Sequence, residues 1–307
     1  MEKAIFKIKD QLGTFKACKF SVRLVVWMAI CAGLGGHSLP ASGESKTKVE
    51  KAQSKHQDRQ MSEEARKNLN AWLQVHQFFS QVVQKNMNAK YAFLGDSITF
   101  LMDKLYVPSM SKEKYGKEAF DAFISKNSYV NVGISGDRVE QLLFRVTNGN
   151  FPEGFTPDHV SVMIGTNNVP FANSPAFQIS SLTMQILDHV HKVSPKSHIW
   201  LLDILPRGGQ NKRDEMFRRK IIEINELNRK AVADKPYVTP VSLYEHFLDS
   251  KGIVRPDFFA VEEHFNLHPN LNGYKEIFAR LESAISEREK EIKEKKEKKA
   301  DKTKNTK

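Results

Sequence analysis

The chain has 307 residues, of which 40% are hydrophobic, and a formal net charge of +11. Residues 1–43 and 287–307 carry +4 each, which leaves only +3 for the long interior. A nucleic-acid-binding protein needs its basic residues on one folded surface, so this distribution excludes nucleic acid from the expected partners. The interior is long enough to bury one hydrophobic core.

Residues 1–43 have the layout of a signal peptide. Six basic residues precede an apolar run at 24–34, and small residues at 38–43 offer a cleavage site. The run is about half of the ~20 residues that span a bilayer. We therefore expect export to the periplasm or the exterior, with an uncleaved N-terminal anchor as the alternative. Both cysteines, Cys18 and Cys31, lie in this leader, so cysteine chemistry is not expected in the mature chain.

Three further segments follow the leader. Residues 44–66 are rich in Lys, Gln, Ser and Glu and are expected to be a polar spacer, and residues 67–286 form the expected folded domain. Residues 287–307 mix acidic and basic side chains almost without apolar ones, so they cannot bury a core. We expect this charged tail to be a solvated extension of the last helix, with at most a weak attraction to an anionic membrane or envelope surface.

Within the domain, apolar runs of strand length alternate with longer amphipathic patterns. The expected strands are 91–94, 129–132, 159–164, 198–202 and 237–241. Residues 178–193 and 218–232 place their apolar side chains at helical spacing. This alternation predicts a parallel sheet covered on both faces, and so a three-layer α/β/α sandwich with a five-stranded parallel sheet.

Glycine-bearing polar turns follow the first three expected strands. They are Gly95-Asp-Ser97, Asn131-Val-Gly-Ile-Ser-Gly-Asp137 and Gly165-Thr-Asn-Asn168. Since ligands bind beyond the carboxyl ends of parallel strands, we expect Ser97 to face a substrate. Taken alone, Gly-Asp-Ser is also typical of a turn that leads into a helix N-cap. His268 stands before the last expected helix and completes the parts that an acyl-transfer site requires.

The order and the amino-acid sequences of these turns resemble those of the SGNH hydrolases, also called GDSL esterases and lipases. Within that family, the chain is most similar to the α subunits of platelet-activating-factor acetylhydrolase Ib and their bacterial relatives. Four segments carry this similarity: Gly-Ile-Ser-Gly-Asp, Gly-Thr-Asn-Asn, Leu-Pro-Arg-Gly-Gly and Trp72-Leu-Gln-Val-His76. The resemblance covers about residues 70–282. It implies a flavodoxin-like fold and ester hydrolysis, and pairing into homodimers occurs in the branch that the chain resembles.

The resemblance implies roles for four residues. Ser97 is the nucleophile, and His268 is the base that takes its proton and later protonates the leaving alcohol. The backbone N–H groups of Ser97 and Gly136 and the side-chain amide of Asn167 form the oxyanion hole. Glycine at 136 is expected to let the backbone approach the substrate without a Cβ clash. In an unrelated protein, Asn167 would be interpreted as a turn or cap residue.

One departure from the family pattern concerns the third member of the triad. The aspartate that usually stands three residues before the histidine is replaced by Phe265. A carboxylate there fixes the histidine tautomer and stabilises the imidazolium, which phenylalanine cannot do. Either Glu263 or Glu262 reaches back to His268, or a backbone carbonyl holds the imidazole in a Ser–His dyad, or hydrolysis has been lost. The intact serine, histidine and oxyanion residues favour the first two explanations.

No metal ion or organic cofactor is expected. His264 and His268 have the i,i+4 spacing of a metal pair, but the metalloprotease glutamate is absent and Pro269 breaks the helical register. The glycine turns lack both a phosphate-loop lysine and the spacing of a dinucleotide-binding fingerprint.

Three functions are consistent with these residues. The first is an exported serine esterase that removes short acyl groups, above all acetyl, from a carbohydrate or a small lipid. The second is a lysophospholipase-like lipid hydrolase, and the third is a catalytically silent protein that binds an acylated glycan. Phe265 favours the silent protein, whereas Ser97, His268 and the oxyanion residues favour the two hydrolases.

Overall fold

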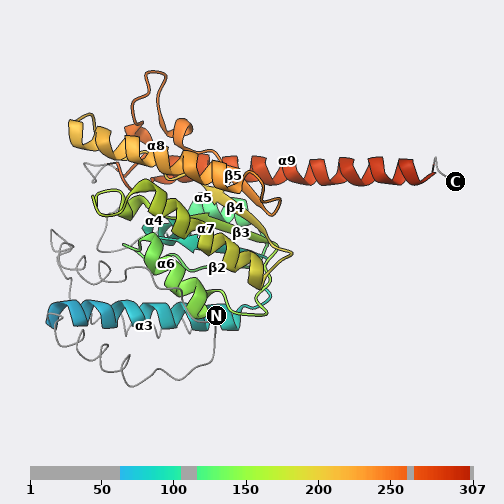
Figure 1. Ribbon diagram of the computed structural model, residues 1–307, viewed down its shortest axis with the longest axis horizontal. Coiled ribbons are helices and arrows are strands. Elements are labelled where there is room, and N and C mark those ends of the chain that lie inside the picture. Colours follow the sequence, from blue (N-terminus) through green and yellow to red (C-terminus); the bar gives the residue numbers. More distant parts are fainter. Residues whose placement is uncertain (1–62, 105–115, 261–265, 305–307) are drawn as a thin grey trace. The chain divides into compact units, whose positions relative to one another are not determined.

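The computed structural model describes residues 63–104, 116–260 and 266–304 (Figure 1). The expected signal peptide and most of the expected spacer lie outside these residues. Helix α3 (Glu63–Lys85) crosses the boundary between two units, Met1–Gln74 and Val75–Lys307. The sheet and every side chain discussed below belong to the second unit.

Five parallel strands form one sheet with the order β2-β1-β3-β4-β5. The strands are β1 (Tyr91–Gly95), β2 (Tyr129–Asn131), β3 (His159–Met163), β4 (His198–Leu202) and β5 (Val238–Val241). This confirms the predicted α/β class, and each strand begins and ends within one residue of the expected position. The chain moves to one side of β1 to form β2 and to the other side to form β3, so the carboxyl ends of these neighbours flank a switch point where ligands bind.

The helices pack against both faces of the sheet (Figure 1). Besides α3 they are α4 (Ser97–Leu101), α5 (Lys117–Ile124), α6 (Val139–Arg145), α7 (Ala176–Val193), α8 (Lys212–Val232) and α9 (Leu271–Lys304). A π-helical turn covers Val146–Asn150, and 3-10 turns cover Thr166–Asn168, Tyr244–Phe247 and Pro256–Phe258.

Alternating side chains of the strands divide the core into two clusters. In β1, Ala92 and Leu94 pack with α6, α7 and α8, whereas Phe93 packs with α5 and α9. In β4, Leu201 belongs to the first cluster and Trp200 to the second. Burying each of the larger side chains stabilises the fold by about 1.5–3 kcal/mol, so strands with two apolar faces are confined to the middle layer.

Helix α8 begins six residues before the position expected from its apolar spacing. The side chain of Asn211 caps it by accepting a hydrogen bond from the Asp214 N–H, with 3.0 Å between the heavy atoms. Its first turn is charged and shows no apolar period, so the periodicity begins only after the helix has started. Asn211 and the acidic residues of this turn, Asp214 and Glu215, are the N-terminal signal that identifies the true start.

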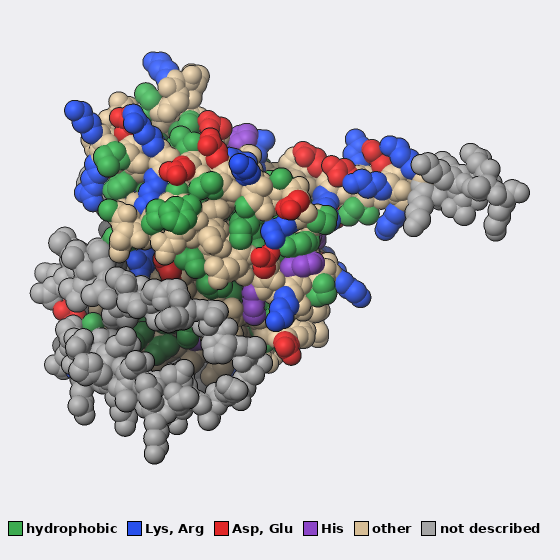
Figure 2. Space-filling view, in the orientation of Figure 1, with side chains coloured by type: hydrophobic (Ala, Val, Ile, Leu, Met, Phe, Trp, Pro, Cys, Tyr) green, Lys and Arg blue, Asp and Glu red, His purple; other side chains and the backbone are tan. Residues whose placement is uncertain are grey.

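Helix α9 continues through the charged segment as far as Lys304. Lysine, arginine and acidic side chains share its outer turns (Figure 2), and the side chains of residues 289–298 are exposed. Lys295 and Glu291 form an i,i+4 ion pair at 3.7 Å. Such pairs stabilise a solvated helix by a few tenths of a kcal/mol, about 0.2–0.5 each. None of the described helices is both long enough and apolar enough to cross a membrane.

Two histidines stand at the amino-terminal ends of β3 and β4, of which His159 is half-buried and His198 is buried. His198 Nε2 lies 2.8 Å from Thr239 Oγ1, and Trp200 Nε1 donates to His159 Nδ1 at 3.2 Å. Burial lowers the pKa of His159 and lowers the pKa of His198 to about 3, where the charge of Arg288 and the other imidazole act in the same direction. Both side chains are therefore neutral in the folded protein at neutral pH.

We expect acid to destabilise the fold through His198. The unfolded chain binds a proton near the ordinary pKa of 6.5, and the folded protein does so only near 3, so stability is present above about pH 6.5 and is lost progressively toward pH 3. His198→Gln should show a shallower fall of the melting temperature between pH 7 and pH 4, followed by circular dichroism. Equal slopes for the variant and the wild type would contradict this assignment.

Candidate active site

Ser97 begins helix α4 directly after β1. Asp96 caps this helix, because its Oδ1 accepts a hydrogen bond from the Ile98 N–H at 2.9 Å. Two glycines let neighbouring backbone come close: a Cβ at Gly95 would lie 2.4 Å from the Met163 carbonyl oxygen, and one at Gly133 would lie 2.3 Å from the Phe100 nitrogen. The turn-and-cap interpretation of Gly-Asp-Ser is therefore correct as a description of local structure, and the same turn presents Ser97.

Ser97 and His268 meet although 171 positions separate them in the sequence. His268 Nε2 lies 2.9 Å from Ser97 Oγ, and the two residues are only 7% and 4% exposed. The segment that carries His268 is held by an antiparallel bridge between Phe259 and Pro269 and by the Ala260 N–H, which donates to the His268 carbonyl at 3.0 Å. A hydroxyl and an imidazole at this distance can exchange a proton, which is the first requirement for an activated serine.

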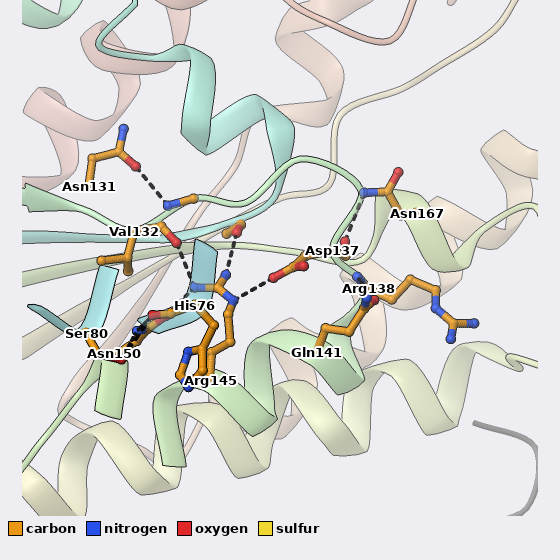
Figure 3. Close-up of polar contacts among 12 residues, drawn as sticks. His76, Ser80, Asn131, Val132, Asp137, Arg138, Gln141, Arg145, Asn150 and Asn167 are labelled. Atoms are coloured by element: carbon orange, nitrogen blue, oxygen red, sulfur yellow. Dashed lines mark hydrogen bonds and ion pairs between the residues drawn. The ribbon is translucent and has the colours of Figure 1, made fainter. Parts of the chain in front are cut away.

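The loops after β2 and β3 also come together (Figure 3). The Asn167 amide Nδ2 donates to the Asp137 carbonyl at 2.9 Å, directly beside Gly136. Its second N–H is the one that an oxyanion would use, and the bond to Asp137 fixes the plane of the amide. Asn168 adds a second tie between the loops by accepting from the Val139 N–H at 3.0 Å.

The backbone conformation gives a further reason for glycine at position 136. Gly136 has a φ of +85°, which L side chains rarely adopt, and a Cβ added there would meet nothing in the protein within 4 Å. The backbone conformation therefore favours glycine, and the expected close approach to a substrate stays a prediction.

Two cations that the sequence did not single out for the site hold the Asn167 turn. Arg207 Nη1 donates to the Thr166 carbonyl at 2.9 Å. Lys220 Nζ donates to the carbonyls of Phe171 at 2.8 Å and Val169 at 3.2 Å. Burial lowers the pKa of Lys220. In the sequence, the only indication for Lys220 was its place on the core-facing side of α8. Helical periodicity alone does not distinguish a half-buried lysine from a solvated one.

A cavity of about 220 Å³ lies beside the segment that carries His268. The described residues that line it include Gly208, Gly209, Gly252, Arg218 and Asn266. Neither Ser97 nor His268 lines it. The Asn266 amide donates to the Gly208 carbonyl at 3.1 Å and so ties the two sides of the cavity together. The cavity therefore adjoins the Ser–His pair without containing it.

The usual position of the third triad member, Phe265, lies outside the described residues, as do Glu262, Glu263 and His264. The interpretation of either glutamate as the residue that orients His268 stays a prediction. Within the described ranges, no three His, Cys, Asp or Glu side chains are grouped so that they could hold a metal ion.

Asp96 is a buried acid next to the Ser–His pair. Burial raises the pKa of Asp96 to about 7, and the Asp137 carboxylate acts in the same direction. The Ile98 N–H and the charges of His268 and Arg207 favour the ionised form and oppose the rise in pKa. The site therefore contains a buried acid whose charge interacts with that of His268.

We expect Asp96→Asn to be more heat-stable than the wild type at pH 8, by at least about 3 °C, and the difference to shrink at pH 5. Since the folded pKa of about 7 exceeds the ordinary 3.8, the stability that Asp96 contributes is present below about pH 4 and is lost as the pH rises to 7. Asparagine keeps the capping oxygen and cannot ionise. Scanning calorimetry of this variant, with the exposed Asp121→Asn as control, tests the effect, and a difference independent of pH would refute it.

Comparison with known proteins agrees with this architecture. Residues 93–276 match the model of the GDSL-like lipase/acylhydrolase family. A provisionally assigned platelet activating factor from Streptococcus pneumoniae shares the fold, with 19% identity, a TM-score of 0.54, and coverage of 73% of this chain and 99% of that one. A GDSL-like lipase from Bacteroides thetaiotaomicron is 20% identical, with a TM-score of 0.46 over 68% of this chain and 98% of that one. No protein with a curated functional description matches the sequence.

The fold and the Ser–His pair place the protein among α/β proteins of the hydrolase type. The family match spans more than half of the chain, and the chain therefore belongs to the GDSL-like lipase/acylhydrolase family. The family resemblance of the glycine turns is confirmed, and family membership supports an ester hydrolase as the general class of protein.

Proposed function

We propose that this protein is an exported serine esterase that removes short acyl groups, above all acetyl, from a carbohydrate or a small lipid. The observation that carries the proposal is the 2.9 Å contact between Ser97 Oγ and His268 Nε2 beside the loops of Gly136 and Asn167. The proposed preference for acetyl groups rests on the amino-acid sequences of the turns, which resemble those of the acetylhydrolase branch. Export rests on the layout of residues 1–43.

The proposed reaction uses these groups in sequence. His268 Nε2 takes the hydroxyl proton of Ser97 while Oγ attacks the ester carbonyl carbon. The negative charge that develops on the carbonyl oxygen is stabilised by the backbone N–H groups of Ser97 and Gly136 and by the Asn167 amide. His268 then protonates the leaving alcohol, and water, activated by the same imidazole, hydrolyses the acyl-serine.

Ser97→Ala should abolish both p-nitrophenyl acetate hydrolysis and covalent labelling by a fluorophosphonate, measured as an intact-mass shift at pH 7 and pH 8.5. The exposed Ser286→Ala is the matched control and should keep both. Hydrolysis that persists unchanged in Ser97→Ala would place the activity elsewhere. No labelling of the wild type at either pH would instead favour a silent protein that binds an acylated glycan.

Asn167→Ala should lower kcat/KM for p-nitrophenyl acetate by about 100- to 1,000-fold, which is the usual loss when one oxyanion donor is removed. The exposed Asn86→Ala, in which a bond to the Val82 carbonyl is lost, serves as the control. A loss of less than about threefold would remove Asn167 from the proposed oxyanion hole.

Acyl length separates this proposal from a lysophospholipase-like hydrolase. The wild type should turn over p-nitrophenyl acetate more efficiently than the octanoate ester and should release little fatty acid from lysophosphatidylcholine. Higher kcat/KM for the longer chain would favour the lipid hydrolase.

A further inference from the structure

A fully buried arginine lies beneath the candidate oxyanion hole (Figure 3). Arg145, the last residue of α6, forms an ion pair with Asp137, with 2.6 Å between Nε and Oδ2. Its Nη1 donates to the Val132 carbonyl and to Asn150 Oδ1, both at 2.7 Å, and its Nη2 donates to the Gly95 carbonyl at 3.1 Å. One guanidinium therefore binds four acceptors from separate parts of the chain.

Three of these acceptors belong to the turns that carry the proposed oxyanion donors. Gly95 ends β1 and lies two residues before Ser97. Val132 follows β2, and Asp137 directly follows Gly136, so the guanidinium holds both ends of the 132–137 loop. The distance between the Ser97 and Gly136 N–H groups depends on how these two turns are held.

The arrangement has features that a purely stabilising ion pair does not need. Hydrophobic residues can often replace a buried ion pair without loss of stability. Here the planar donors of arginine match carbonyls on two adjacent strand ends, a geometry that the single ammonium group of lysine cannot reproduce. Asp137 contacts both Arg145 and Asn167. Its carboxylate pairs with Arg145, and its backbone carbonyl accepts a hydrogen bond from the Asn167 amide.

The side chain of Asn150 orients the Arg145 guanidinium. The Asn150 amide donates to Ser80 Oγ at 2.9 Å and to the His76 carbonyl at 3.3 Å, both on α3, while its oxygen accepts from Arg145. The Asn150 side chain thus fixes the direction of Nη1 from the opposite side of the site. Helix α3 is linked to the proposed oxyanion hole by this chain of polar contacts.

We propose that Arg145 is a positioning residue that sets the separation of the Ser97 and Gly136 N–H groups. The inference rests on the proposed esterase function. Arg145 does not touch the substrate, and it acts by holding the turns after β1 and β2 at a common centre. A displacement of about 1 Å in such a site is enough to cost about 100-fold in rate.

The test compares Arg145→Gln and Arg145→Lys with Arg229→Gln. The control breaks a similar contact, between Arg229 and the buried Asp203 at 2.7 Å, at the end of β4. Activity toward p-nitrophenyl acetate is expressed per active site titrated with fluorophosphonate, so unfolded molecules do not count. We expect Arg145→Gln to lower kcat about 100-fold with KM changed less than about threefold, Arg145→Lys to recover part of the loss, and the control to keep its kcat. An unchanged kcat per titrated site in Arg145→Gln would overturn the proposal.

Hydrogen exchange provides a second readout that does not depend on turnover. Peptides covering residues 132–137 should exchange faster in Arg145→Gln than in the wild type and should be unaffected in Arg229→Gln. If the wild type proves inactive while this difference appears, the esterase function fails and the positioning of the loop stands. Should Arg145→Gln not fold, Asn150→Ala, which removes the Asn150 contacts but leaves the bonds of Arg145 to Gly95, Val132 and Asp137, should lower kcat in the same direction. Unchanged exchange and unchanged kcat in that variant would refute the role.

Discussion

The hydrogen bonds of the Arg145 guanidinium connect the sheet to the candidate site. Parallel strands end at one edge of a sheet, but their following turns separate unless something holds them. Arg145 donates to the Gly95 and Val132 carbonyls and pairs with Asp137, so the turns that carry Ser97 and Gly136 share one partner. A charge removed from water is costly unless it is fully bonded, so this centre resists any movement that would break a contact.

The rest of the site is held in the same way from other elements. Arg207 and Lys220 donate to carbonyls of the turn that carries Asn167, and Tyr274 of α9 donates to the Ile98 carbonyl at 2.7 Å. These contacts hold backbone carbonyls of the turns in place. A preorganised oxyanion hole needs such support, because donors that must rearrange during the reaction stabilise the transition state less.

The family's usual triad aspartate is replaced by Phe265, and Asp96 is a buried acid next to the Ser–His pair. Asp96 is buried, its pKa is raised to about 7, and the charge of His268 favours its ionised form. Family membership supports an ester hydrolase in general, and these contacts describe the surroundings of the Ser–His pair in this chain.

The amino-acid sequence alone predicts the class of fold, because short apolar runs of strand length alternate with longer amphipathic patterns and each such signal is local. The family resemblance of the glycine turns and of the segment around His268 also gives Ser97, Gly136, Asn167 and His268 as candidate site residues. Only the tertiary structure decided that Ser97 Oγ and His268 Nε2 meet at 2.9 Å, since 171 positions separate them and no local pattern encodes the distance. The same holds for Arg145 and Lys220, which look like ordinary basic residues of amphipathic helices until folding brings the carbonyls of distant turns within reach.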